Sequence, residues 1–210
     1  MSLDLLLVRH GESEGNAAGA FTGHGPSPIT ARGRRQAEAV GRCLAAEGTA
    51  LAALYSSDLP RAVQTAEALR EAMGAAHVGT PLRLRADLRE RAMGAWEGVA
   101  FTEIQSRHPE DWQRLVARAL DHSPPGGESH RAVGRRVAAA LSAVCAEHAT
   151  GRVVVVSHGV AIHHMLRHLL GVEGEGVSFT ADNCSVQRLS LGDGRVRAVA
   201  LNDTRHLLGV

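Results

Sequence analysis

One stretch decides the fold of this chain, namely Leu5-Leu6-Leu7-Val8-Arg9-His10-Gly11-Glu12. A short apolar run that stops at two basic residues and a glycine is typical of a strand buried on both faces. Such a strand carries Arg9 and His10 to its carboxyl end. In open α/β sheets this end borders the crevice in which ligands bind. We therefore expect the Arg-His pair to lie in a functional site.

A second stretch repeats the pattern, namely Val153-Val154-Val155-Val156-Ser157-His158-Gly159. Taken alone, each stretch is also explained by a core strand that ends in a histidine on a loop. Together they would bring two imidazoles and Arg9 to the same edge of one sheet. This concentration of positive charge serves no structural need, and it indicates a local site for an anion.

The composition limits the possible partners of the chain. Its 210 residues suffice for a sizeable core, and no linker rich in Pro, Gly or Ser divides them, which predicts a single domain over residues 1–210. The net charge of +1 excludes a strong general attraction to nucleic acid or to a membrane. All 23 basic residues are arginine, so a phosphate would be held by planar bidentate groups.

The N-terminus and the cysteines predict the compartment. The N-terminal apolar run is too short for a signal peptide or a membrane span and follows no basic leader, so we expect a cytoplasmic protein. Cys43, Cys145 and Cys184 are widely spaced and form no CxxC pair. They are predicted to be reduced, buried thiols in a reducing compartment.

Strands and helices alternate along the chain, which predicts an α/β fold, a three-layer α/β/α sandwich with a mostly parallel central sheet. Thr30 and Asp58 are the expected N-caps of two helices. Arg61 would then lie near a helix N-terminus, where the dipole favours an anion, although taken alone it is equally explained as a solvated surface side chain. The other expected elements are strands at 51–55, 82–84, 184–191 and 195–201, the last two joined by a Gly192-Asp193-Gly194 turn, and helices at 129–148 and 160–170.

Residues 95–128 are predicted to be an insertion with one or two short helices. Insertions between core elements commonly serve as lids or as walls that determine specificity. The aromatic residues expected to form such walls are Phe21, Trp96, Phe101 and Trp112.

The histidines and arginines could together transfer a phosphoryl group. Arg9 and Arg61 can each direct two N–H groups at a phosphate, and His158 can add a donor once it is protonated. His10 is then free to attack phosphorus, provided that its other ring nitrogen donates to a backbone carbonyl. The product of the attack would be a phosphohistidine, and no metal ion is needed.

The leaving alkoxide needs a proton, and Glu90 is our candidate for the donor. In the second half of the reaction its carboxylate can deprotonate the water that hydrolyses phosphohistidine. The alternative is that Glu90 is only a structural partner of Arg89 or Arg91.

Residues 9–16 resemble the RHGE motif of the histidine phosphatase superfamily, also called phosphoglycerate mutase-like. Further blocks follow in the family's order at residues 21–23, 27–30, 56–66 and 157–159. The resemblance implies a phosphoglycerate mutase-like fold and a phosphomonoester hydrolase that uses no cofactor. It also implies the roles of nine residues: His10 as the phosphorylated group, Arg9, Arg61 and His158 as the phosphate pocket, Glu90 as the proton donor, and Asn16, Thr22, Gly23 and Gly159 as substrate contacts.

Two functional alternatives exist within this resemblance. A cofactor-dependent phosphoglycerate mutase would carry a tyrosine and a lysine where this chain has Met93 and Phe101, and an Arg-Arg pair in the insertion. The segment 94–98 instead resembles the GxWEG turn of small phosphatases. A pseudo-phosphatase that only binds phosphorylated ligands would lack His10 or Glu90, and both are present.

Twelve histidines raise the possibility of a metal site, since His164 and His168 stand one helical turn apart beside His163. No carboxylate or cysteine stands beside them at ligand spacing, so we expect packing or surface histidines and no metal. The expected partner is a small phosphorylated metabolite, whose identity the sequence does not determine. A monomer and a homodimer both remain open.

Overall fold

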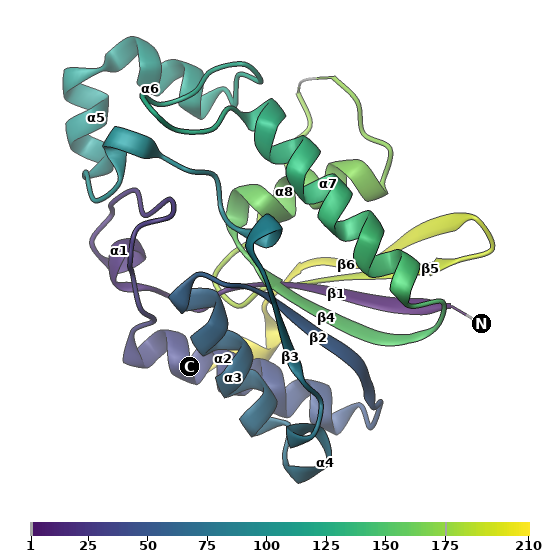
Figure 1. Cartoon of the computed structure of the whole chain (residues 1–210). Coiled ribbons are helices and arrows are strands. Elements are labelled where there is room, and N and C mark those ends of the chain that lie inside the picture. Colours follow the sequence, from purple (N-terminus) through teal and green to yellow (C-terminus); the bar gives the residue numbers. More distant parts are fainter. Residues whose placement is uncertain (1, 175) are drawn as a thin grey trace.

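The computed structural model describes residues 2–174 and 176–210. It contains a six-stranded sheet with helices on both faces, as predicted (Figure 1). In the strand order β3-β2-β4-β1-β5-β6, the first four strands are parallel, β5 is antiparallel to β1, and β6 is antiparallel to β5. The strands are β1 (Leu3–Arg9), β2 (Leu51–Ser57), β3 (Leu82–Arg85), β4 (Gly151–Ser157), β5 (Val186–Gly192) and β6 (Arg195–Asp203).

Two helix pairs cover the sheet. One face packs against α2 (Ala31–Ala46) and α3 (Pro60–Ala72), and the other against α7 (His130–Glu147) and α8 (Gly159–Leu169) (Figure 1). Side chains of β1 alternate between the two apolar layers, and all four from residue 5 to 8 are at most 1% exposed. The apolar run is therefore buried on both faces, and each such side chain contributes about 1.5–3 kcal/mol to folding.

The register of the parallel strands sets the site. Arg9, the last residue of β1, pairs with Ser157, the last residue of β4. His10 and His158 therefore leave the sheet side by side at its carboxyl edge. On the other side of β4, Ser56 of β2 pairs with Val156, so the end of β2 lies beside the end of β4.

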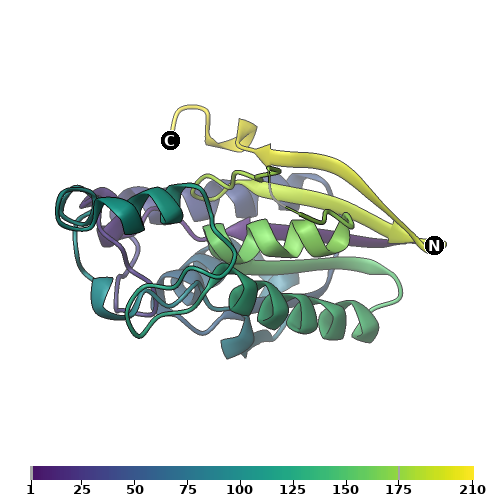
Figure 2. The same ribbon diagram turned by 90° about the horizontal axis from the view of Figure 1, so that it is seen from above.

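The region expected to be an insertion projects beyond this edge of the sheet (Figure 2). It contains two short helices, α5 (Phe101–Arg107) and α6 (Pro109–Val116), as predicted. The remaining helical segments are α1 (Glu14–Ala17), α4 (Ala75–Val78) and the 3-10 turns η1 (Ala86–Leu88), η2 (Gly94–Trp96) and η3 (Arg205–Leu207). In the described part of the chain, no helix is both long and apolar enough to cross a membrane.

The ends of several elements test the expected caps and turns. Thr30 is the N-cap of α2, and its hydroxyl accepts the N–H of Gly33 at 3.0 Å. The β5–β6 hairpin is also confirmed, because Asp193 and Gly194 both have positive φ, as a type I′ turn requires. The prediction that Asp58 is a helix N-cap is wrong. α3 begins at Pro60 after the N-cap Leu59.

Asp58 has a different partner, and one further expectation is corrected. Asp58 instead accepts both Nε and Nη2 of Arg89 at 2.6 Å, a bidentate ion pair that holds the carboxylate away from the helix end. Cys43 is exposed on α2 and Cys145 is only partly buried, so the prediction that all three thiols are buried holds for Cys184 alone. Cys43, Cys145 and Cys184 are all free thiols.

Candidate active site

Three basic side chains from separate elements meet at the carboxyl edge of the sheet. The rings of His10 and His158 lie 5.1 Å apart, and both residues are buried. Arg61, the second residue of α3, is fully buried beside them. This burial excludes the interpretation of Arg61 as a solvated surface residue.

His10 is held as a neutral ring whose Nε2 accepts a hydrogen bond from Arg61. Its Nδ1 lies 2.7 Å from the carbonyl oxygen of Gly11, which can only accept, so Nδ1 carries the proton. Nε2 therefore presents a lone pair, with Nε of Arg61 at 3.3 Å. Burial, with the charges of Arg9 and Arg61, holds the pKa of His10 well below its ordinary value of 6.5. A neutral imidazole of this kind is a nucleophile at neutral pH.

The turn after β1 admits only glycine at residue 11. A Cβ there would lie 2.4 Å from the carbonyl oxygen of Gly33 in α2, which is backbone and cannot move aside. This close approach brings the Gly11 carbonyl into the position that orients the His10 ring.

The two arginines are anchored and still have N–H groups to offer. Arg61 donates Nη2 to the carbonyl of Gly23 at 2.7 Å, and Arg9 donates Nη1 to the carbonyl of Ala181 at 2.7 Å. Nε of Arg9 is buried and has no partner among the described residues. Burial lowers the pKa of both guanidinium groups, and the nearby carboxylate of Glu90 partly opposes this. A dianionic ligand would restore the balance of charge.

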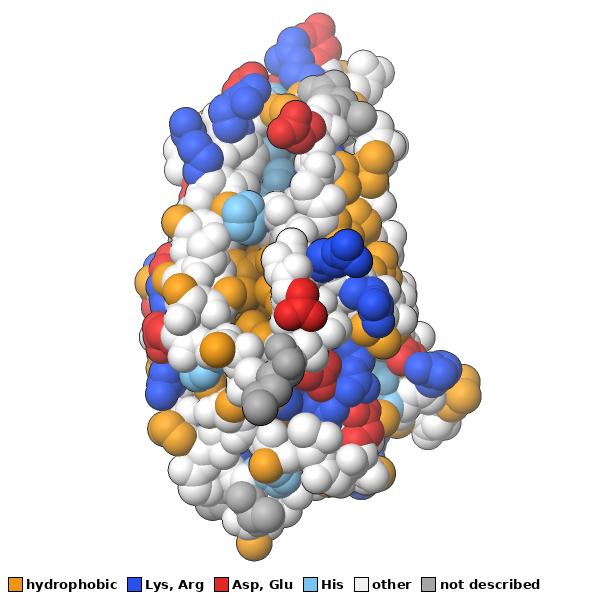
Figure 3. Space-filling view, turned by 90° about the vertical axis from the view of Figure 1, so that its right-hand side faces the viewer, with side chains coloured by type: hydrophobic (Ala, Val, Ile, Leu, Met, Phe, Trp, Pro, Cys, Tyr) orange, Lys and Arg blue, Asp and Glu red, His pale blue; other side chains and the backbone are white. Residues whose placement is uncertain are grey.

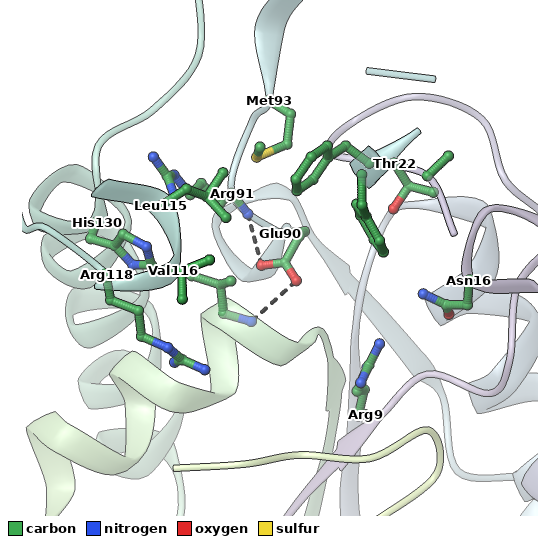
Figure 4. Close-up of a pocket in the computed structure, with 15 residues that line it drawn as sticks. Arg9, Asn16, Thr22, Glu90, Arg91, Met93, Leu115, Val116, Arg118 and His130 are labelled. Atoms are coloured by element: carbon green, nitrogen blue, oxygen red, sulfur yellow. Dashed lines mark hydrogen bonds between the residues drawn. The ribbon is translucent and has the colours of Figure 1, made fainter. Parts of the chain in front are cut away.

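Glu90 lies across the cleft from these groups, at the N-terminus of α8 (Figure 4). Oε1 accepts the backbone N–H groups of Arg91 at 2.8 Å and Ala161 at 3.2 Å, and Oε2 accepts that of Val160 at 3.1 Å. The hydrogen bonds of the Arg89 and Arg91 side chains go to other groups than Glu90. The side chain of Arg89 binds Asp58, and that of Arg91 donates to two backbone carbonyls.

A cleft of about 340 Å³ opens between these elements (Figure 4). Arg9, Asn16, Thr22 and Glu90 line the end near the strands, and Gly23 also lines the cleft. Oδ1 of Asn16 accepts from three donors, which leaves the Nδ2 group to donate into the cleft. Four predicted site residues are not among those that line the cleft, namely His10, Arg61, His158 and Gly159. Gly159 lies beside it, because a Cβ built on it would be 3.7 Å from the guanidinium carbon of Arg9.

The wall of the cleft differs from the expected one. Phe21 and Phe101 line it, with ring centroids 4.5 Å apart. Trp96 and Trp112 do not, because both pack into a small apolar core with Ile104 that supports α5 and α6. Sequence reasoning missed the residues that line the far end of the cleft, namely Met93, Leu115, Val116, Arg118 and His130.

The histidines considered as metal ligands have other partners. Nε2 of His164 lies 3.0 Å from Nδ1 of His130, and His168 contacts the Ser142 hydroxyl at 3.0 Å. Burial lowers the pKa of His163 to about 3 and that of His164 to about 4, so both are neutral packing groups. Within residues 2–174 and 176–210, no three His, Cys, Asp or Glu side chains form a group that could hold a metal ion.

The sequence profile of the histidine phosphatase superfamily (branch 1) matches residues 5–204. The chain belongs to this superfamily. It is 34% identical to phosphoserine phosphatase 1 of Hydrogenobacter thermophilus, over 97% of this chain and 93% of that protein. It is 35% identical to a probable phosphoglycerate mutase of Salmonella choleraesuis, over 89% of this chain and 84% of that protein.

Solved structures of histidine phosphatases share the same fold. The YhfR protein of Bacillus stearothermophilus aligns with a TM-score of 0.88 and 27% identity, over 98% of this chain and 99% of that one. The phosphoglycerate mutase of Bacillus anthracis aligns with a TM-score of 0.80 and 23% identity, over 99% of this chain and 96% of that one, which confirms the phosphoglycerate mutase-like fold.

Proposed function

We propose that this histidine phosphatase hydrolyses phosphomonoesters of small metabolites through a phosphohistidine on His10, without a metal ion. One observation carries the proposal: the Gly11 carbonyl fixes the proton of His10 on Nδ1, so that Nε2 faces the arginine pocket as a nucleophile. Arg9 and Arg61 supply the positive charge that phosphoryl transfer requires.

The first step breaks the ester bond. Nε2 of His10 attacks phosphorus while the P–O bond to the alcohol breaks, and Glu90 gives its proton to the leaving oxygen. Glu90 must be protonated at this point, and the negative charge of a bound phosphate favours that state. The alcohol then leaves through the cleft.

The second step regenerates the enzyme. Glu90, now a carboxylate, takes a proton from water as the water oxygen attacks phosphorus. The P–N bond breaks, inorganic phosphate is released, and His10 returns to its neutral form with the proton on Nδ1.

We propose that the alcohol portion of the substrate carries a carboxylate. Arg118 lies at the far end of the cleft, and its buried Nη1 has no partner among the residues that the structure describes. Its φ of 54° is in the left-handed region, which side chains other than glycine rarely adopt and which recurs at functional sites. The relative from Hydrogenobacter is named for phosphoserine, which is such an acid. Residues 95–128 would then act as the specificity wall.

A phosphoglycerate mutase is the second candidate, because the relative from Salmonella is named as one and Arg118 suits an acid. Met93 and Phe101, which stand where the mutases carry a tyrosine and a lysine, favour the hydrolase.

A panel of phosphorylated metabolites, run with and without 2,3-bisphosphoglycerate, tests the proposal. We expect phosphate release from phosphoserine and other phosphorylated acids at a rate that does not depend on the bisphosphate. Arg118→Gln should raise KM for these acids and leave sugar phosphates unaffected. Isomerisation of phosphoglycerate without phosphate release would refute the hydrolase.

We further propose that the enzyme works in the cytoplasm, which suits three free thiols. Sedimentation at several concentrations would decide between the monomer and the homodimer.

A further inference from the structure

Ser57, the last residue of β2, contacts the second histidine of the site. Its hydroxyl oxygen lies 2.9 Å from Nε2 of His158, and both residues are 0% exposed. The backbone N–H of Leu59 donates to the same oxygen at 3.3 Å. This arrangement follows from the register, which sets the end of β2 beside the end of β4.

The position of the proton on His158 follows from these contacts. The Ser57 hydroxyl has one proton, and among the described residues its only acceptor is Nε2 of His158. A buried hydroxyl that donates nothing is costly, so the proton points at Nε2. A neutral His158 then carries its own proton on Nδ1. That atom is buried and has no hydrogen-bond partner within the described residues.

We propose that Ser57 is a positioning residue, which holds His158 in the Nδ1–H tautomer so that the neutral ring donates to a phosphoryl oxygen. This inference rests on the proposed function, because the bound phosphoryl group is the missing acceptor. It replaces the sequence-based expectation that His158 donates only once it is protonated.

The surroundings of His158 disfavour the imidazolium. With both nitrogens protonated, Ser57 would have to accept from the ring and from Leu59, and its own proton would have no acceptor. The charged and titratable groups that face the ring are Arg61 of α3, Arg9 at the end of β1, His10 after it, and His24. Burial and these neighbours hold the pKa of His158 well below its ordinary value.

NMR of the full-length protein with ¹⁵N-labelled histidine tests the tautomer directly. Long-range ¹H–¹⁵N correlations distinguish a protonated ring nitrogen from an unprotonated one, and the His158 signals are assigned by their loss in His158→Gln. We expect Nδ1 protonated and Nε2 unprotonated, both in the free protein and with inorganic phosphate bound. Protonation at Nε2, in either state, would overturn the proposal.

Ser57→Ala provides the second test, with Ser56→Ala as the matched control. Ser56 is equally buried, but its hydroxyl donates to the carbonyl of Ser57 and does not contact His158. We expect Ser57→Ala to weaken inorganic phosphate binding in calorimetry on the order of tenfold and to change the His158 tautomer. Ser56→Ala should change neither.

Unchanged phosphate affinity and tautomer in a folded Ser57→Ala protein would overturn the inference. Should that variant not fold, the tautomer of the wild-type protein decides. Failure of the wild-type protein to bind phosphate would count against the proposed function, whereas the tautomer of the free protein would still decide the inference.

Discussion

Glu90→Gln separates proton donation from every other role of this side chain. Glutamine has the shape of glutamate, so its amide oxygen can keep the two backbone bonds now made by Oε1, from Arg91 and Ala161. The amide nitrogen would face the N–H of Val160, and the bond now made there at 3.1 Å is lost. One such loss lowers the free energy of unfolding by about 1–3 kcal/mol, which leaves the protein folded.

The effect on catalysis should be much larger and should depend on the leaving group. An alkoxide needs a proton as it leaves, so we expect phosphorylation of His10 by an alkyl phosphate to slow on the order of a hundredfold or more. The p-nitrophenolate ion leaves without a proton and should lose much less in this step. Hydrolysis of the phosphohistidine also slows, because water loses its base. The intermediate should then accumulate, with a burst of nitrophenol.

Rapid-quench kinetics on both esters measures this difference. Glu97→Gln is the control, because Oε1 of Glu97 accepts the backbone N–H groups of His24 and Met93, a structural role like the one that Glu90 also has. It should slow both esters by the same small factor. An equal slowing of the burst phase for alkyl and aryl esters in Glu90→Gln would show that Glu90 is not the proton donor.

Three further predictions concern the metal, the arginine pocket and acid stability. Activity should survive exhaustive EDTA treatment, because arginines supply the charge; loss on chelation and recovery with a divalent ion would contradict this. Arg61→Lys should lower kcat/KM on the order of a hundredfold, because one ammonium cannot bind the Gly23 carbonyl and also face His10. The circular dichroism spectrum should be unchanged. A near-normal kcat/KM would refute this prediction. Burial lowers the pKa of His130, His163 and His164 to about 2, 3 and 4. The unfolded chain therefore binds more protons, and the urea midpoint should fall as pH drops from about 6.5 towards 4. His164→Gln should flatten this dependence, and an unchanged slope would argue against the assignment.

The sequence predicts the centre of the site because a small number of physical rules is enough to determine its position. A short apolar run has one plausible structure in an α/β chain, and parallel strands end at a common edge. Arg9, His10 and His158 therefore lie close together, and their proximity does not depend on the conformation of the loops. The sequence offers Glu90 as a candidate proton donor, but it does not show that the backbone N–H of Val160 in α8, 70 residues away, holds its carboxylate.

The failures share a dependence on distant packing. Aspartate often caps helices, but in the folded chain Arg89 lies close enough to bind the carboxylate of Asp58 instead. From the sequence, Trp96 and Trp112 could either line a cleft or support its wall. Their packing beneath α5 and α6 gives them the supporting role. Arg118 lines the cleft with a left-handed backbone conformation, which no local sequence pattern predicts.

Identification of the phosphorylated atom tests the central claim most directly. The protein is mixed with a phosphomonoester, quenched at alkaline pH within one turnover, and mapped by mass spectrometry and by phosphohistidine isomer analysis. We predict an acid-labile phosphoryl group on Nε2 of His10, because Nδ1 is engaged with Gly11. His10→Ala should show no label and no turnover while it remains folded, since its strand is held by Leu5 to Val8. A phosphoryl group on Nδ1, on another residue, or equally present in His10→Ala would contradict the account.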